Sequence, residues 1–252
     1  MCNNTILIPI DFSDVCYSAV LYGLEFCRQY KLNAELFHVD TGVESNPKVV
    51  AGFKHVVDLY IKKFGIGVSF VEVKGELFET ISFEMRSHEY AFILMGTPGK
   101  SGFQLLMGSS ASKIINTSSI PVIVLQSKRF ANVKNIVLPI SRISGNGNGV
   151  VEIVKKAEFF GATLHMVYRS EGQKTAKYYQ SQFEGKVNFV LENFDESGYI
   201  GTFVEQVLNY CSTNDIDMIA TVLDEPKMTV FDYSYEQLLF NVELIPVMCI
   251  RG

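Results

Sequence analysis

The sequence lacks an excess of basic residues and any long apolar run. Its 252 residues include 22 lysines and arginines against 27 aspartates and glutamates, for a net charge of −5. This balance, with no basic block, argues against nucleic acid as the main partner. No apolar stretch is long enough to cross a bilayer, so we expect no membrane association. The polar residues 1–5 do not resemble a signal peptide, and we expect a cytoplasmic protein.

Cysteine and histidine are scarce, and neither is arranged as in a metal or catalytic site. The five cysteines have no spacing typical of zinc or redox chemistry, which favours reduced and mostly buried thiols. The four histidines fall on different predicted elements. We expect His38 and His165, in equivalent strands, to be satisfied sheet or crevice residues rather than metal ligands. Residue order reveals no catalytic triad and no positioned general base, so we expect no enzyme.

Short apolar runs alternate with helical patterns along the chain. Hydrophobic residues make up 48% and charged residues 19%, enough to bury a full core. Residues 6–11 form an apolar run that ends in an acid, typical of a strand buried on both faces of a parallel sheet. Ser13 is placed to cap the next helix. Further strands are expected over 34–39, 68–73, 91–95 and 120–125, with helices between them, which predicts an α/β, doubly wound, five-stranded parallel sheet.

The same order of elements begins again after residues 128–134. Residues 136–140 repeat 6–10, residues 162–167 repeat 34–39, and a strand over 187–191 takes the third place. The remaining matches continue in the same order and end with 245–250, which repeats 120–125. This pattern predicts a tandem duplication of two Rossmann-like units, over residues 1–128 and 133–252.

A glycine-rich stretch follows the fourth strand of the first unit. It contains Gly96, Gly99 and Gly108, and then Ser109 and Ser110 at the start of a predicted helix. Glycines let a backbone approach a ligand closely, and a helix start favours anions. In a doubly wound sheet the first and fourth strands flank the switch point, so Asp11 and this loop are expected to face one crevice. Glycines that serve only as turns explain the spacing equally well. A Walker A loop at residues 94–101 is disfavoured because Leu94 stands in place of its first glycine.

Residues 6–11, 36–39 and 95–110 resemble the universal stress protein (UspA-like) family, whose fold is of the adenine nucleotide alpha hydrolase type. The likeness runs through both halves and is strongest over residues 4–126. By this resemblance Asp11 contacts the ribose or adenine side, and Val39 meets adenine through its backbone. The implied nucleotide-binding set is Pro9, Ile10, Asp11, Val39, Met95, Gly96, Gly99, Gly108, Ser109 and Ser110, in which the glycines and serines hold ribose and phosphates.

The resemblance implies a stress-response regulator that binds ATP, ADP or AMP, with Mg²⁺ accompanying the phosphates. Between Gly99 and Gly108 the chain has one residue fewer than the family fingerprint Gly-x2-Gly-x9-Gly-Ser/Thr. Because one residue spans up to about 3.3–3.6 Å, the phosphate loop is narrower, and AMP or ADP is expected to fit better than ATP. The alternative is a stress protein that binds no nucleotide and acts as a dimerisation or partner-interaction module.

The second unit departs further from the nucleotide-binding pattern. Ser141 replaces the aspartate, and residues 222–235 contain no glycine. Asp224 and Glu225 would repel phosphates there, so we expect this unit to bind no nucleotide. Alternating Phe231, Tyr233 and Tyr235 are expected to fill the vacated pocket. In the family, units pair through their last strands, which implies an intrachain pseudo-dimer of 122–125 with 247–250, alongside a possible homodimer and an unidentified protein partner.

Overall fold

The chain divides into two compact units, Met1–Phe130 and Ala131–Gly252. The computed structural model describes residues 4–42, 47–96, 110–126, 129–140, 147–196, 202–223, 238, 241 and 244–252. Each unit is an α/β unit whose five strands pair in parallel, which confirms the predicted fold class. The expected pairing of the two last strands stays a prediction.

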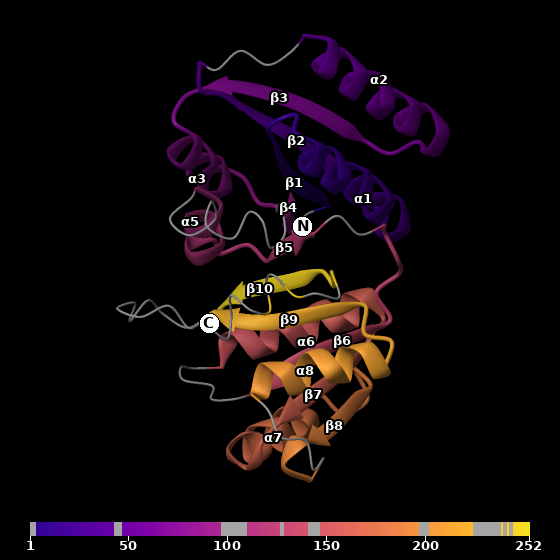
Figure 1. Cartoon of the computed structure of the whole chain (residues 1–252), viewed down its shortest axis with the longest axis vertical. Helices are drawn as coiled ribbons and strands as arrows, with labels where there is room; N and C mark the ends of the chain where they lie inside the picture. The colour runs from indigo at the N-terminus through magenta and orange to yellow at the C-terminus, as the bar shows by residue number, and fades with distance from the viewer. Residues whose placement is uncertain are drawn as a thin grey trace. The chain divides into compact units, whose positions relative to one another are not determined.

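The first unit is a doubly wound sheet with helices on both faces. Its strands lie in the order β3-β2-β1-β4-β5, all parallel. Helices α1 and α2 lie on one side of this sheet, and α3 and α5 lie on the other (Figure 1). The elements are β1 (Thr5–Ile10), α1 (Asp14–Tyr30), β2 (Asn33–Asp40), α2 (Pro47–Phe64), β3 (Val68–Lys74), α3 (Leu77–Ser87), β4 (Phe92–Gly96), α5 (Ser110–Thr117) and β5 (Val122–Leu125).

The two central strands of this sheet are buried from both faces. Ile6, Leu7 and Ile8 of β1, and Ile93 and Leu94 of β4, are fully buried. This burial explains why both strands are continuous apolar runs rather than alternating ones. Because the helices cover both faces, polar side chains are confined to the ends of these strands.

Helix α1 begins and ends at residues whose side chain or backbone satisfies the helix termini. The Cys16 N–H donates to Ser13 Oγ at 3.2 Å, which confirms the predicted cap. At the other end Lys31 adopts a left-handed conformation, and its N–H donates to the Cys27 carbonyl. The N-terminus of α1 therefore lies directly after the carboxyl end of β1.

An aromatic cluster joins the last residue of the first unit to its core. Phe26 on α1 is fully buried. Its ring lies 5.5 Å from the ring of Phe92 on β4 and 6.2 Å from that of Phe130, both edge-on. Tyr22 and Tyr30 surround the same rings. The segment that leaves β5 is thus anchored on α1.

The second unit repeats this architecture in the strand order β8-β7-β6-β9-β10, again all parallel. The third strand begins at Phe189 rather than at the predicted Val187, because residues 183–186 form a turn after α7 and residue 187 lies in a bend. The elements are β6 (Asn135–Ile140), α6 (Asn148–Phe160), β7 (Thr163–Tyr168), η2 (Ser170–Gly172), α7 (Gln173–Gln182), β8 (Phe189–Asn193), η3 (Phe194–Glu196), α8 (Phe203–Thr213), β9 (Met218–Leu223) and β10 (Val247–Arg251).

The described cysteines lie in the interior of the units. Cys16, Cys27, Cys211 and Cys249 are buried and form no disulfide with one another, as predicted for reduced thiols, whereas Cys2 lies outside the described residues. The described part of the chain holds no group of three His, Cys, Asp or Glu residues arranged to bind a metal ion. Among the helices described, none combines the length and apolarity needed to span a bilayer.

The two strand histidines are hydrogen-bonded, which confirms the prediction made for them. His38 Nδ1 donates to the Ile10 carbonyl at 2.9 Å. In the second unit His165 Nδ1 lies 2.8 Å from Tyr210 Oη, and His165 Nε2 lies 3.3 Å from Asn135 Oδ1. Because the Asn135 oxygen accepts, Nε2 carries the proton, and a neutral His165 accepts at Nδ1 from the tyrosine.

His165 is expected to make the second unit less stable in acid. Burial lowers the pKa of His165 below its ordinary value of 6.5. The unfolded chain therefore takes up this proton at a higher pH than the folded chain. The contribution of His165 to the free energy of unfolding is complete above about pH 6.5 and is lost as the pH falls below that value. Urea unfolding of the second unit at pH 7.5 and 5.5 measures the effect. His165→Gln should reduce the loss, while the exposed His55→Gln should not; equal losses in all three proteins would contradict the assignment.

Candidate functional site

The sheet of the first unit opens at the carboxyl ends of its central strands. Within the described residues, β1 pairs with β4 through Ile6↔Phe92 and Leu7↔Ile93, and the pairing stops there. Beyond that point β4 continues to pair with β5 as far as Gly96, and β1 continues to pair with β2 as far as Ile10. The two strands thus separate where the chain order reverses, which is the place where open α/β sheets bind ligands.

The end of β1 is tied to β2 rather than to β4. Pro9 has no N–H to donate, and the Ile10 carbonyl accepts from His38 Nδ1 on β2. Ile10 itself is buried. These contacts bind the end of β1 to β2, beyond the last residue that pairs with β4.

Asp11 lies in a tight turn between β1 and α1. Its Oδ1 accepts from the Ser13 N–H at 3.0 Å, and the residue is exposed. Between them Phe12 has φ of 60°, a left-handed conformation that is uncommon for a bulky residue. Sequence reasoning did not single out Phe12, because a backbone angle of this kind leaves no pattern in a sequence.

The Phe12 ring anchors this turn on the α1–α2 face of the sheet. Its centroid lies 4.6 Å from that of His38 and 5.5 Å from that of Phe53 on α2. Phe70 of β3 lies beside it at 6.5 Å. Aromatic pairs of this kind contribute beyond simple burial, and a strained backbone persists only where its surroundings hold it. The ring therefore fixes the turn from which the Asp11 carboxylate projects.

Gly96 is required by the packing of α1 on the end of β4. A Cβ atom added to Gly96 would lie 2.9 Å from the Val15 carbonyl oxygen and 3.1 Å from the Ala19 Cβ. No other residue lets the helix approach so closely. Since α1 starts shortly after Asp11, its first turns lie between Asp11 at the end of β1 and Gly96 at the end of β4.

The N-terminus of α1 brings partial positive charge to this edge. The N–H groups of its first turn cannot bond within the helix, and they carry the positive end of the helix dipole. Asp14 in the same turn offsets part of that charge. The edge can therefore accept a group of low negative charge, or hydroxyl oxygens, without a basic side chain.

Val39 contributes backbone groups to the same edge. The Asn33 N–H donates toward β1, to Asn4, and the Ala34 N–H donates toward β3, to Gly67. By the alternation of a strand, Val39 points its N–H and carbonyl to the β1 side. The last β1–β2 pair is Ile10↔His38, so no residue of β1 remains to bond the Val39 carbonyl. The side chains of Val39 and Met95 are buried beneath the edge.

Cys16 lies in the first turn of α1 next to Asp11 and is not a reactive thiol. Burial raises its pKa to about 12. The thiolate is the nucleophilic form of cysteine, so Cys16 packs as a small apolar residue at neutral pH. The edge is therefore lined by binding groups: one carboxylate, strand-end backbone and a helix start.

The corresponding edge of the second unit is packed by its own chain. A Cβ atom added to Gly172 would lie 2.5 Å from the Ile140 carbonyl oxygen and 2.8 Å from the Tyr168 Cβ. The turn after β7 thus lies directly against the end of β6. From α7, the Tyr179 hydroxyl donates to the Gly147 carbonyl at the start of α6 at 3.3 Å.

Several predicted residues of the glycine loop, and of the corresponding edge in the second unit, fall outside the described residues. These are Gly99, Gly108 and Ser109, together with Ser141, Asp224, Glu225, Phe231, Tyr233 and Tyr235 of the second unit. Ser110 is the first residue of α5. The structure thus brings Pro9, Ile10, Asp11, Val39, Met95 and Gly96 to one edge of the sheet, and the phosphate part of the predicted site stays a prediction.

Comparison with known proteins identifies the first unit. A family model described as the universal stress protein family matches residues 3–126. The first unit belongs to the universal stress protein family. A search of curated proteins gives no significant match.

Solved structures share the fold of the chain over its whole length. A universal stress protein from Archaeoglobus fulgidus has a TM-score of 0.72 at 18% identity, covering 100% of this chain and 99% of its own. A putative universal stress protein from Pseudomonas aeruginosa has a TM-score of 0.64 at 12% identity, covering 99% and 94%. A universal stress protein family protein from Arabidopsis thaliana, solved with AMP bound, has a TM-score of 0.36 at 16% identity over 49% of this chain and 92% of its own, too low to carry an argument about ligands.

Proposed function

We propose that the first unit of the chain binds an adenine nucleotide at the open carboxyl edge of its sheet, and that the chain acts as a stress-response regulator. The observation that carries the proposal is the separation of β1 from β4 beyond Leu7 and Ile93, with Asp11 and the start of α1 beside the gap. The exposed Asp11 carboxylate suits the hydroxyl groups of a ribose. The Val39 carbonyl suits the exocyclic amine of adenine.

The phosphates are assigned to the sequence fingerprint. Gly99, Gly108, Ser109 and Ser110 would hold them through backbone N–H and hydroxyl groups, and the α1 dipole would assist. Mg²⁺ would arrive with the phosphates, since the described residues offer no cluster that binds a metal by itself. Because the loop is one residue short, AMP or ADP is the expected ligand. The second unit is proposed to bind none, since Gly172 and Tyr179 pack across the equivalent edge.

Replacing Asp11 by alanine is expected to weaken nucleotide binding about ten- to a hundred-fold. A hydrogen bond to a charged group contributes about 1.5–3 kcal/mol, and about 1.4 kcal/mol corresponds to a tenfold change in affinity. Calorimetric titration with AMP, ADP and ATP measures the dissociation constants. The matched control is Asp58→Ala, which removes an exposed carboxylate from α2 and should leave the affinity unchanged.

The proposal fails if wild-type protein gives no heat with any of the three nucleotides at millimolar concentration. A second, independent readout is the mass of any nucleotide released when the purified protein is heat-denatured. An adenine nucleotide recovered from wild type and lost from Asp11→Ala would support the assignment.

The second candidate function is a partner or dimerisation module that binds no nucleotide. The shortened Gly99–Gly108 spacing favours it, because a shorter loop leaves less room for phosphates. This candidate predicts no retained nucleotide and no thermal shift with nucleotide. Replacing Gly108 by a bulky residue would then change nothing, whereas under the first proposal it abolishes the shift.

A further inference from the structure

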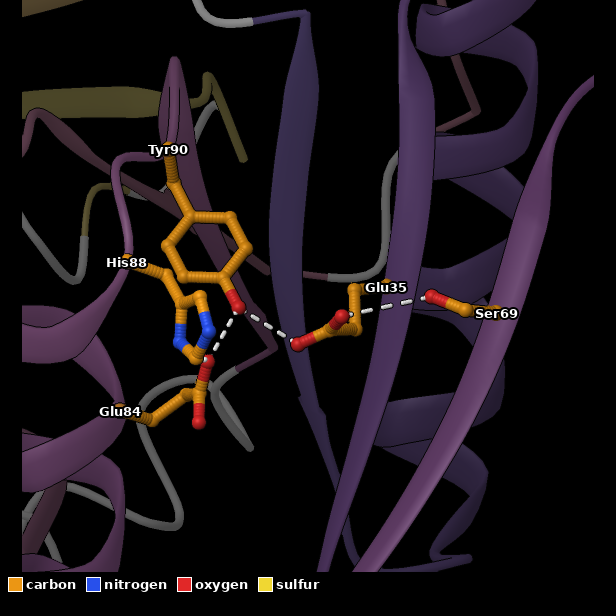
Figure 2. A network of polar contacts seen from close by, with 5 residues as sticks. All are labelled: Glu35, Ser69, Glu84, His88 and Tyr90. Carbon is orange, nitrogen blue, oxygen red and sulfur yellow. Dashed lines mark hydrogen bonds and ion pairs between the residues drawn. The ribbon is translucent and has the colours of Figure 1, made fainter.

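Helices α1, α2 and α3 of the first unit are not equally attached to its sheet. Helix α1 buries side chains along its whole length. The end of α3 is tied to β2 through Tyr90, whose hydroxyl oxygen lies 2.5 Å from Glu84 Oε1 on α3 and 2.5 Å from Glu35 Oε1 on β2 (Figure 2). Of the α2 side chains that the structure describes, Phe53 and Val57 are the buried ones. Helix α2 therefore rests on the unit through a small buried contact, as is typical of elements of low local stability.

The outer part of α2 does little to hold this helix in place. Val49 and Leu59 are apolar, yet they are 46% and 51% exposed. In proteins, most of the stability of a helix comes from the packing of its apolar face rather than from the helix itself. The position of α2 on the unit therefore depends mainly on the side chains of Phe53 and Val57.

Phe53 lies against the turn of the candidate site. Its ring centroid lies 5.5 Å from that of Phe12, edge-on, and 6.0 Å from that of Tyr17 on α1. One residue further along α2, Lys54 Nζ lies 4.6 Å from the centroid of the Phe70 ring. Phe70 in turn lies beside Phe12. Helix α2 thus contacts the Phe12 ring directly through Phe53 and indirectly through Phe70.

The Phe12 ring has a second close neighbour, which belongs to the sheet. The ring of His38 lies 4.6 Å away, and His38 Nδ1 donates to the Ile10 carbonyl, so this neighbour is fixed on β1 and β2. The backbone of Phe12, with φ of 60°, is unfavourable for a bulky residue and persists only where its surroundings hold it. Since His38 is fixed by the sheet, Phe53 is the contact that a movement of α2 would remove.

We propose that Phe53 is a positioning residue of the nucleotide site, so that packing of α2 on Phe12 and binding of nucleotide at Asp11 stabilise each other. This proposal rests on the nucleotide binding proposed above. With α2 packed on the unit, Phe12 keeps its left-handed backbone, and the Asp11 carboxylate accepts from the Ser13 N–H. When α2 moves away, Phe12 relaxes to an ordinary backbone conformation, and the carboxylate leaves its place at the edge of the sheet.

Phe53→Ala should weaken nucleotide binding by the full-length protein about five- to fiftyfold, within the range usual for coupled sites. Only the molecules with α2 in place bind, so the apparent affinity falls with their fraction. Calorimetric titration with AMP, ADP and ATP measures the change. The matched control Leu59→Ala removes an exposed apolar side chain from the same helix and should change the affinity by less than about twofold. Should Phe53→Ala fail to fold, Phe53→Leu is expected to weaken binding in the same direction and beyond the control.

Hydrogen exchange without nucleotide tests the turn directly. The Cys16 N–H donates to Ser13 Oγ at 3.2 Å, and the Tyr17 N–H donates to the Ser13 carbonyl at 2.9 Å, so both amides report the state of the turn. We expect Phe53→Ala to raise the opening equilibrium of both amides at least about fivefold over wild type. The amides at the end of α3 are the internal control and should exchange at the wild-type rate.

Two further measurements separate a positioning role from a general loss of packing. Saturating nucleotide should slow exchange along α2 of wild type, because the coupling of two equilibria is reciprocal. In a Phe12→Leu background, Phe53→Ala should weaken binding much less than it does in wild type, because the contact that carries the effect is already altered. If Phe53 acted through Tyr17 alone, the losses of the two substitutions would multiply.

The proposal is overturned if nucleotide binds Phe53→Ala as tightly as wild type, if the Cys16 and Tyr17 amides exchange equally in both proteins, or if the losses from Phe12→Leu and Phe53→Ala multiply. These results would leave nucleotide binding by the first unit intact. A wild type that binds no nucleotide overturns the proposed function instead, and faster exchange in Phe53→Ala would then still show that α2 sets the conformation of the turn.

Discussion

A Gly96→Val variant is expected to lose about 1–3 kcal/mol of first-unit stability, the usual cost of overpacking. A Cβ atom at this position would lie 2.9 Å from the Val15 carbonyl oxygen, and backbone cannot move aside as a flexible side chain can. The first turns of α1 would have to lift from the end of β4. Because the same turns follow Asp11, we expect nucleotide binding to weaken as well. Urea unfolding and calorimetric titration measure the two effects.

Gly52→Ala is the matched control for this experiment. Gly52 lies within α2, and nothing lies within 4 Å of a Cβ added there. Alanine should stabilise the helix by about 0.5–1 kcal/mol and leave binding unchanged, because glycine has the larger entropy loss on folding. A Gly96→Val protein as stable as wild type would show that α1 does not pack on β4 as described.

Phe26→Ala should reduce the free energy of unfolding of the first unit by about 3–5 kcal/mol, the range found for removing a buried aromatic ring. Phe26 is fully buried and its ring contacts those of Phe92 and Phe130. Its loss leaves a cavity between α1 and β4 and frees the segment after β5. Urea unfolding of the full chain, analysed for two transitions, measures the change.

Phe83→Ala removes the same side chain from a position that is 66% exposed on α3. We expect a change within about 0.5 kcal/mol, as is usual for surface substitutions. Equal losses in the two variants would mean that the aromatic cluster around Phe26 is not the core of the first unit.

Much of the carboxyl-edge site could be predicted because strand ends are visible in a sequence. The apolar run at 6–10 shows where β1 ends, and in a parallel sheet the residues after each strand gather at one edge. Asp11 and Gly96 were found in this way, whereas Val39 came from the family resemblance. The sequence did not show why position 96 is a glycine. A residue without a side chain lets α1 pack on the end of β4, and α1 begins 82 residues earlier in the chain.

Other features had no signal in the sequence. The left-handed backbone of Phe12 follows from where its ring packs, among His38, Phe53 and Phe70, which come from three different elements. The closure of the second unit's edge was expected from aromatic residues 231–235, which lie outside the described residues. The described packing at that edge comes from Gly172 and Tyr179 instead.

The sequence by itself determined the two α/β units, their parallel sheets and the residues at the strand ends, because hydrophobic periodicity records which faces are buried along each element. Only the tertiary structure decided how β1 separates from β4 and how Tyr90 meets Glu35, a residue 55 positions away. Such contacts depend on strand register and on the placement of α3. A shift of one residue would turn Glu35 to the other face of the sheet, and the local pattern of the chain does not encode its distant partners.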